Sequence, residues 1–151
     1  MTPEQVLQAL PQQPPFRFLE EILELDSTHI VGRYTFKHDE FFYRGHFPGD
    51  PVTPGVILTE AMAQTGVVAL GLYLTAQTLP AEALSQWTTL FTECQMEFHL
   101  PVLPGDTVTM RGEKLFFRRM KLKSRVELML ADGRLAAEGT LAGVGVKRGQ
   151  K

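Results

Sequence analysis

The sequence predicts an α+β fold in which one long central helix is wrapped by one antiparallel sheet. Between residues 51 and 81 the only charged side chain is Glu60, so a helix starting near Gly55 must be buried on nearly every side. Before and after this segment, runs rich in β-branched and aromatic residues alternate with turn residues, which is typical of antiparallel strands. No internal repeat or second core interrupts this order, and we expect residues 1–151 to form a single domain.

Composition narrows the class of protein. An apolar content of 44% and a charged content of 21% are ordinary for a soluble globular domain. The net charge of -2 favours neither nucleic acid nor membrane as a partner. A single cysteine excludes a disulfide framework and no secretory signal is visible, which together indicate a cytoplasmic protein. We expect that cysteine, Cys94, to be a small buried residue.

The first elements are a short helix and a pair of strands. Thr2 is the expected N-cap of the helix, with Pro3 in its first turn and Gln5 closing a capping box. After a proline-rich linker, residues 16–25 and 29–36 read as two antiparallel strands joined by a tight turn.

The remaining elements follow a long loop. The central helix is expected over residues 55–75. Its apolar run approaches the length of a membrane span, but Glu60 and Gln64 interrupt it, so we interpret it as buried in protein. The later strands are expected at residues 88–98, 107–117 and 121–130, followed by a last strand that ends near residue 146. The surface of the helix that one sheet leaves uncovered suggests a partner subunit.

Two residues near the start of the helix suggest acid/base chemistry. The loop Arg44-Gly-His-Phe-Pro-Gly-Asp-Pro-Val-Thr-Pro-Gly55 holds His46, and Glu60 follows in the apolar helix. Histidine and a buried carboxyl are the parts of an acid/base pair. The structural alternatives are a packed loop histidine and a Glu satisfied by its neighbours. Gln64, one turn below Glu60, could orient that carboxyl or could be an amide that satisfies the core.

These residues resemble those of the hot-dog-fold (3R)-hydroxyacyl-[acyl-carrier-protein] dehydratases of the FabZ type. The resemblance rests on Gly45-His-Phe-Pro-Gly49, Pro54-Gly-Val56 and Glu60-Ala-Met-Ala-Gln64. Weaker matches are Leu10-Pro11 with Pro15-Phe16, and the segment from Phe98 to Asp106. The resemblance therefore covers nearly the whole chain.

The resemblance implies an assembly and a site. Members of this family are obligate dimers, often trimers of dimers, with the active site at the dimer interface. His46 would come from one subunit and Glu60 from the other, and the backbone N–H groups of Phe47 and Gly55 would form an oxyanion hole. The substrate arrives on the phosphopantetheine arm of an acyl carrier protein, and the reaction requires no metal or other cofactor.

The chemistry of dehydration agrees with this assignment. A neutral His46 imidazole can remove the C2 proton, and Gly55 at a helix N-terminus can stabilise the enolate charge. Burial should favour the protonated form of Glu60, which could then give a proton to the departing hydroxyl. In the alternative division of roles, His46 handles both protons and Glu60 polarises a water.

The sequence departs from the family pattern at three places. Gln12-Gln13 replaces a His-Arg pair, Glu20-Glu21 replaces Asp-Arg, and His99-Leu100 replaces basic residues. These changes suggest a specialised relative, for example in secondary metabolism, or a subunit of a hetero-oligomer. A Glu at position 60, where the related dehydratase/isomerases carry Asp, favours dehydration without double-bond isomerisation.

A basic stripe forms a second candidate surface. By alternation, Arg119, Lys121, Lys123 and Arg125 share one strand face, which could bind an acidic carrier protein or could be an ordinary solvated face. No nucleic-acid motif accompanies it.

Two other functions remain open. A hot-dog acyl thioesterase would hydrolyse the same type of thioester but would not require the His-Phe-Pro-Gly loop paired with Glu60. A weakly active partner subunit of a heteromeric dehydratase would keep the fold and act only with a second hot-dog chain.

Overall fold

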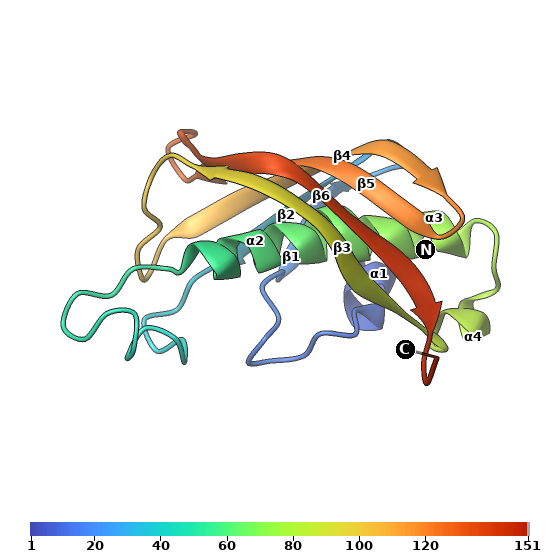
Figure 1. The fold of residues 1–151 in the computed structure, drawn as a ribbon, viewed down its shortest axis with the longest axis horizontal. Coiled ribbons are helices and arrows are strands. Elements are labelled where there is room, and N and C mark those ends of the chain that lie inside the picture. The colour runs from blue at the N-terminus through green and yellow to red at the C-terminus, as the bar shows by residue number, and fades with distance from the viewer. Residues whose placement is uncertain (151) are drawn as a thin grey trace.

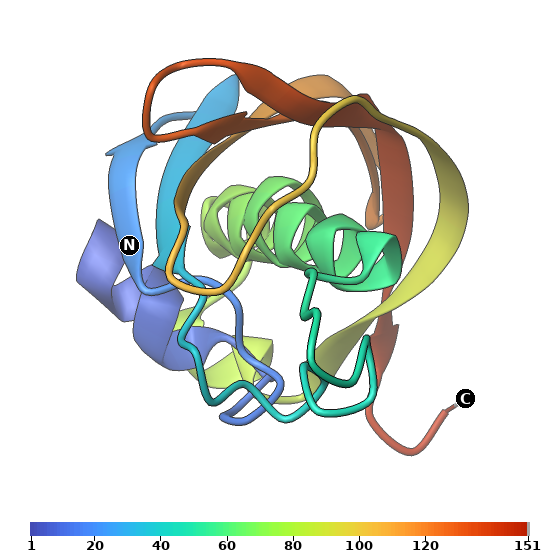
Figure 2. The ribbon, with the colours of Figure 1, turned by 90° about the vertical axis from the view of Figure 1, so that its left-hand side faces the viewer.

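A six-stranded antiparallel sheet curls around one helical rod in the computed structural model, which describes residues 1–150 (Figures 1 and 2). The strand order is β1-β2-β4-β5-β6-β3. The elements are α1 Pro3–Ala9, β1 Glu21–Leu25, β2 His29–Thr35, α2 Gly55–Ala63, η1 Gln64–Ala69, α3 Leu70–Ala76, α4 Ala81–Leu84, β3 Trp87–Phe98, β4 Thr107–Arg118, β5 Lys121–Leu130 and β6 Leu135–Lys147. The predicted fold class, a hot-dog fold, is confirmed.

The central rod is the core of the fold. The continuous helical segment Gly55–Ala76 is long and apolar enough to cross a membrane, but 67% of its most apolar window is buried inside the protein. Viewed from the end, the sheet arches over this segment, and the N-terminal segment and the long loop lie below it (Figure 2). The interpretation of this apolar run as a buried core helix is therefore correct.

A glycine pair brings the rod close to the sheet. A Cβ atom on Gly112 of β4 would lie 2.5 Å from Cα of Gly66 in η1, and one on Gly66 would lie 2.8 Å from Val126 of β5. Real Cβ atoms do not approach other atoms this closely, so these two elements can touch only through glycine.

The rod contains a π-helical turn that the sequence did not predict. In η1, backbone hydrogen bonds shift from the α-helical spacing, and the widened turn changes which carbonyls find partners within the helix. The hydroxyl of Ser124, which is fully buried on β5, donates to the carbonyl oxygen of Gly66 at 2.7 Å. The sheet therefore supplies a donor to the widened turn.

Some predicted boundaries moved. The capping box of Thr2 and Gln5 is present as expected. The first strand begins at Glu21, because the backbone groups of Phe16 and Phe18 bond to Gln64 of the rod rather than to a neighbouring strand. The short helix α4 was not predicted.

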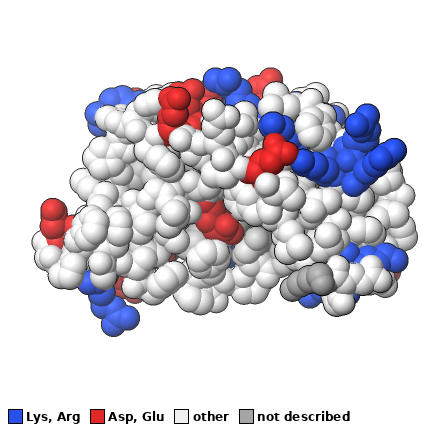
Figure 3. Space-filling view, viewed as in Figure 1, with Lys and Arg blue, Asp and Glu red and all other residues white. Residues whose placement is uncertain are grey.

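Strand β3 is an open edge of the sheet. It pairs only with β6, and most of its residues are exposed. The prediction that Cys94 is buried is therefore wrong, since Cys94 lies exposed on this edge. Large apolar side chains on the edge and around the start of α2 are also exposed, namely Phe47, Val56, Leu90, Phe91 and Phe98. The face that carries β3 shows few charged side chains (Figure 3).

Candidate active site

The long loop fixes His46 in one tautomer. His46 Nδ1 lies 2.8 Å from the carbonyl oxygen of Val52, and the His46 carbonyl accepts the N–H of Val52 at 3.0 Å. A carbonyl oxygen can only accept, so Nδ1 carries the ring proton and donates it. The lone pair on Nε2 is then available to act as a base.

Two hydrogen bonds of Thr53 hold the end of this loop in place. The hydroxyl groups of Thr53 and Tyr43, both on buried residues, lie 2.6 Å apart. The N–H of Thr53 donates to the carbonyl of Val102 at 2.9 Å. The loop between His46 and α2 is therefore attached to the connection between β3 and β4 at the end that precedes α2.

Glu60 lies in the second turn of α2 and is partly buried. Burial raises the pKa of its carboxyl above the usual range, and a hydrogen bond from Gln64 opposes that rise. The expectation that burial favours its protonated form agrees with this direction.

Gln64 fulfils both roles that the sequence left open. Its side-chain nitrogen donates to Glu60 Oε1 and to the carbonyl of Phe16, each at 2.9 Å. Its side-chain oxygen accepts the N–H of Phe18 at 2.7 Å. The fully buried amide thus orients Glu60 and also connects α2 to the segment before β1.

Glu60 lines a small cavity, and His46 does not line it. This cavity has a volume of about 150 Å³, and its walls include Gln12, Val67, Val68 and Phe91. Within one chain, the structure brings Glu60 and Gln64 together but gives His46 no contact with this cavity. The predicted oxyanion donors lie elsewhere as well.

The two predicted oxyanion donors differ in availability. The N–H of Phe47 donates to the carbonyl of Asp50 at 3.3 Å, which is a long hydrogen bond. Gly55 is the first residue of α2, where backbone N–H groups have no partner within the helix. Gly55 also lies against the ring of Phe98, which a Cβ atom on Gly55 would approach to 3.2 Å.

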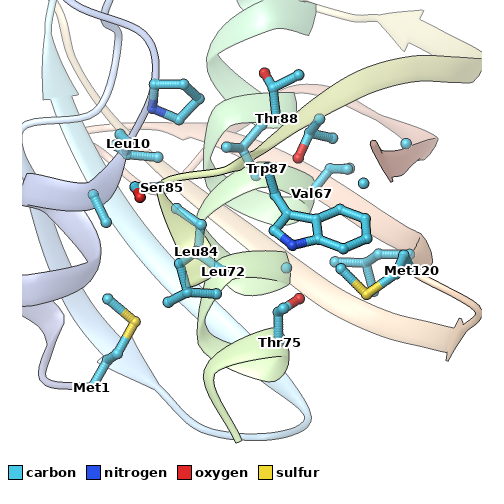
Figure 4. A pocket seen from close by; sticks show the side chains of 18 of the residues that line it. Met1, Leu10, Val67, Leu72, Thr75, Leu84, Ser85, Trp87, Thr88 and Met120 are labelled. Carbon is cyan, nitrogen blue, oxygen red and sulfur yellow. The ribbon is translucent and has the colours of Figure 1, made fainter. Parts of the chain in front are cut away.

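A larger cavity continues from the small one. It has a volume of about 370 Å³ and shares Val67, Val68 and Thr89 with the cavity at Glu60 (Figure 4). At its far end the side chains of Trp87 and Met120 extend toward each other (Figure 4). Of the apolar side chains of Phe47, Met62, Phe91, Met96 and Phe98, only Phe91 lines either of these two cavities.

The basic stripe is partly neutralised by acidic neighbours. Lys121 and Lys123 both pair with Glu93 of β3. Arg125 lies within 4 Å of carboxylates on Glu127 and Glu138. Arg119 lies in the β4–β5 turn rather than on the strand face. Docking of a carrier protein at this stripe stays a prediction.

The fold and the site together define a class: a hot-dog protein with a partly buried Glu of raised pKa on the central helix and a His held in one tautomer in the preceding loop. The chain belongs to the FabA-like domain family, which matches residues 10–143. The predicted family resemblance is thereby confirmed.

Two curated relatives have the same enzyme name. The chain is 36% identical over 143 residues to the 3-hydroxyacyl-[acyl-carrier-protein] dehydratase FabZ of Acetivibrio thermocellus, covering 93% of this chain and 92% of the relative. It is also 36% identical over 137 residues to the FabZ dehydratase of Thermus thermophilus, covering 91% and 92%.

Solved structures support the fold. A dehydratase heterocomplex from Xenorhabdus doucetiae matches with a TM-score of 0.77 at 17% identity, covering 98% of this chain and 93% of that chain. A thioesterase from Haemophilus influenzae matches with a TM-score of 0.68 at 16% identity, covering 97% and 92%. At these identities the likeness shows the hot-dog fold alone.

Proposed function

We propose that this protein dehydrates (3R)-3-hydroxyacyl thioesters, carried on an acyl carrier protein, to trans-2-enoyl thioesters. The observation that carries the proposal is the geometry of the two side chains. Gln64 donates to the partly buried Glu60 carboxyl, whose pKa burial raises, and the Nδ1–H of His46 is committed to Val52, which leaves Nε2 as a base. Elimination of water requires one group of each kind.

In the proposed reaction, two proton transfers remove water from the substrate. Nε2 of His46 takes the proton from C2, and the electron pair of that bond forms the C2–C3 double bond. The C3–O bond breaks, and the Glu60 carboxyl protonates the departing oxygen to give water. Return of the proton from the His46 imidazolium to the Glu60 carboxylate restores the starting state. Donors near Gly55 stabilise the charge that develops on the thioester oxygen.

We further propose that the pair is completed across a dimer. One chain does not bring His46 to the cavity at Glu60. The exposed β3 edge and the exposed side chains of Phe47, at 52%, and Val56, at 76%, offer apolar surface for a second copy. Each dimer of a trimer of dimers, or a pair formed with another hot-dog chain, would use this edge.

Mixing two inactive variants tests both parts of this proposal. His46→Ala and Glu60→Ala proteins are each expected to be inactive. A co-refolded mixture is expected to recover about a quarter of wild-type activity, because half of the dimers are mixed and each holds one intact pair. Mass spectrometry of the carrier-bound product measures the loss of one water.

Three results would overturn parts of the proposal. A mixture that stays inactive would contradict the shared site. Release of a free acid by the wild-type protein would favour the thioesterase alternative. Water loss only after a second hot-dog chain is added would favour the partner-subunit alternative.

The rest of the proposal concerns cofactors, the partner protein and the location in the cell. We propose that the reaction needs no metal or other cofactor, because the two side chains supply both proton transfers. The acyl carrier protein is the proposed partner, with Arg119, Lys121, Lys123 and Arg125 as its candidate contacts. A cytoplasmic location is proposed, where carrier-bound acyl chains are elongated.

The larger cavity is the proposed site for the far end of the acyl chain. Met120 lies in its wall and, like Arg119, has a positive φ, 62° and 51° respectively. These are the two central residues of the β4–β5 turn, where such angles favour Asn-Gly. Holding a methionine there costs backbone strain, which is typical of positions kept for a function.

Met120→Gly is expected to shift chain-length preference upward. Glycine relieves the positive φ and removes the end of the cavity wall, so the kcat/KM ratio of a longer to a shorter acyl chain should rise about tenfold. Arg119→Asn, in the same turn but outside the cavity wall, is the control. Since both chains ride on the same carrier, a docking defect cancels in the ratio. An unchanged ratio in Met120→Gly would exclude this wall as the limit.

A further inference from the structure

The side-chain oxygen of Gln12 is an orphan. Within residues 1–150, Gln12 Oε1 is the buried side-chain polar atom that has no hydrogen-bond partner. Burying an amide oxygen without a donor costs free energy, so such atoms in folded proteins call for an explanation. The sequence offered no signal for this beyond the unusual Gln12-Gln13 pair.

Gln12, which carries this oxygen, lines the small cavity of about 150 Å³ together with Glu60. Glu60 is committed on one oxygen to Gln64, at 2.9 Å. The neighbour Gln13 differs in each respect: its amide donates to the carbonyl of Leu10 at 3.0 Å, and it lines the larger cavity.

The amide oxygen of Gln12 and the carboxyl of Glu60 together match the hydrogen-bonding groups of a hydroxyl. An amide oxygen only accepts hydrogen bonds, whereas a protonated carboxyl can donate one. A hydroxyl has one hydrogen to donate and lone pairs with which to accept. A hydroxyl placed in this cavity could therefore donate to Gln12 Oε1 while it accepts the Glu60 proton.

We propose that Gln12 binds the 3-hydroxyl group of the substrate through its side-chain oxygen and so turns a lone pair of that hydroxyl toward Glu60. This inference rests on the proposed dehydratase function, since it names how that site recognises its leaving group. A saturated acyl chain has no hydroxyl and would leave Oε1 without a donor. Sites of this kind discriminate strongly against analogues that lack the group they bind.

The test compares binding with and without the hydroxyl. In a His46→Ala background, which prevents turnover, affinities are measured for 3-hydroxyacyl and saturated acyl thioesters of equal length on the same carrier. The His46→Ala protein is expected to favour the hydroxyacyl form. Adding Gln12→Met, which replaces the amide by an apolar chain of similar length, should reduce that preference about 10- to 100-fold. Adding Gln13→Met instead should leave it unchanged.

A stability measurement separates recognition from folding. Gln12→Met removes a buried acceptor that has no donor, so its Tm should equal or exceed that of the parent. A preference that survives Gln12→Met, or one that Gln13→Met removes equally, would overturn the proposal.

Different results would refute the dehydratase function and the role of Gln12. Because binding is measured without turnover, the preference can be read even if the wild-type protein forms no enoyl product. No enoyl product with any carrier would refute the dehydratase function. Enoyl product together with an unchanged preference in Gln12→Met would refute the role of Gln12 alone.

Discussion

Replacing Glu60 by Gln is expected to lower kcat/KM for dehydration about 10²- to 10⁴-fold while leaving the fold intact. The amide has nearly the same shape as the carboxyl but has no acidic proton to give to the departing hydroxyl. Gln64 can still contact position 60, because its side-chain nitrogen can donate to an amide oxygen as it does to Glu60. Steady-state kinetics with mass detection of the enoyl product measure the loss.

The pH dependence of stability provides the control. Burial raises the pKa of Glu60, so the folded state favours the protonated carboxyl. That contribution to stability is present at low pH and is lost as pH rises through the folded-state pKa. The Tm of Glu60→Gln relative to wild type should therefore increase as the pH rises through that pKa. A variant with a lower Tm than wild type above that pKa would show that its inactivity reflects damage to the fold.

Gly112→Ala is expected to destabilise the protein by about 3 kcal/mol, because its Cβ would lie 2.5 Å from Cα of Gly66. The obstructing atom belongs to the backbone of η1 and cannot rotate away. The rod or the strand would have to move, and close-packed interiors resist such shifts. For a chain of this length, that loss corresponds to a decrease in Tm of about 10 °C, measurable by calorimetry.

Gly71→Ala is the matched control for this prediction. Gly71 lies in α3, on the same rod, and a Cβ there would meet only Leu122 at an ordinary distance of 3.7 Å. Alanine in a helix is favoured over glycine by about 0.5–1 kcal/mol, so this variant should be slightly more stable. Equal destabilisation by both substitutions would show that close approach at Gly112 is not the cause.

Periodicity and turn residues predicted the architecture because both reflect local chemistry. The single charge in the apolar segment indicated the buried rod, and runs of β-branched and aromatic residues between turn residues indicated the strands. Burial on β3 was predicted less well. Alternation identifies the faces of a strand but not whether the fold leaves an edge uncovered, which is why Cys94 was misplaced.

The site was predictable where motif and chemistry coincide, as at His46, Glu60 and Gln64. Two features involve contacts between segments that are far apart in the sequence, so local sequence patterns did not predict them. The π-helical turn contacts Gly112 and Ser124 of the sheet. The orphan oxygen of Gln12 depends on where the linker passes the start of the rod.

The π-helical turn sets the rotational phase between the two halves of the rod. Each residue advances an α-helix by about 100°, and a π-helical turn holds more residues than an α-helical turn. A one-residue deletion that returned Gln64–Ala69 to α-helical spacing would therefore keep the two ends of the rod in phase. The same deletion in an α-helical part of the rod would leave Glu60 in place but turn a different side of α3 toward the larger cavity.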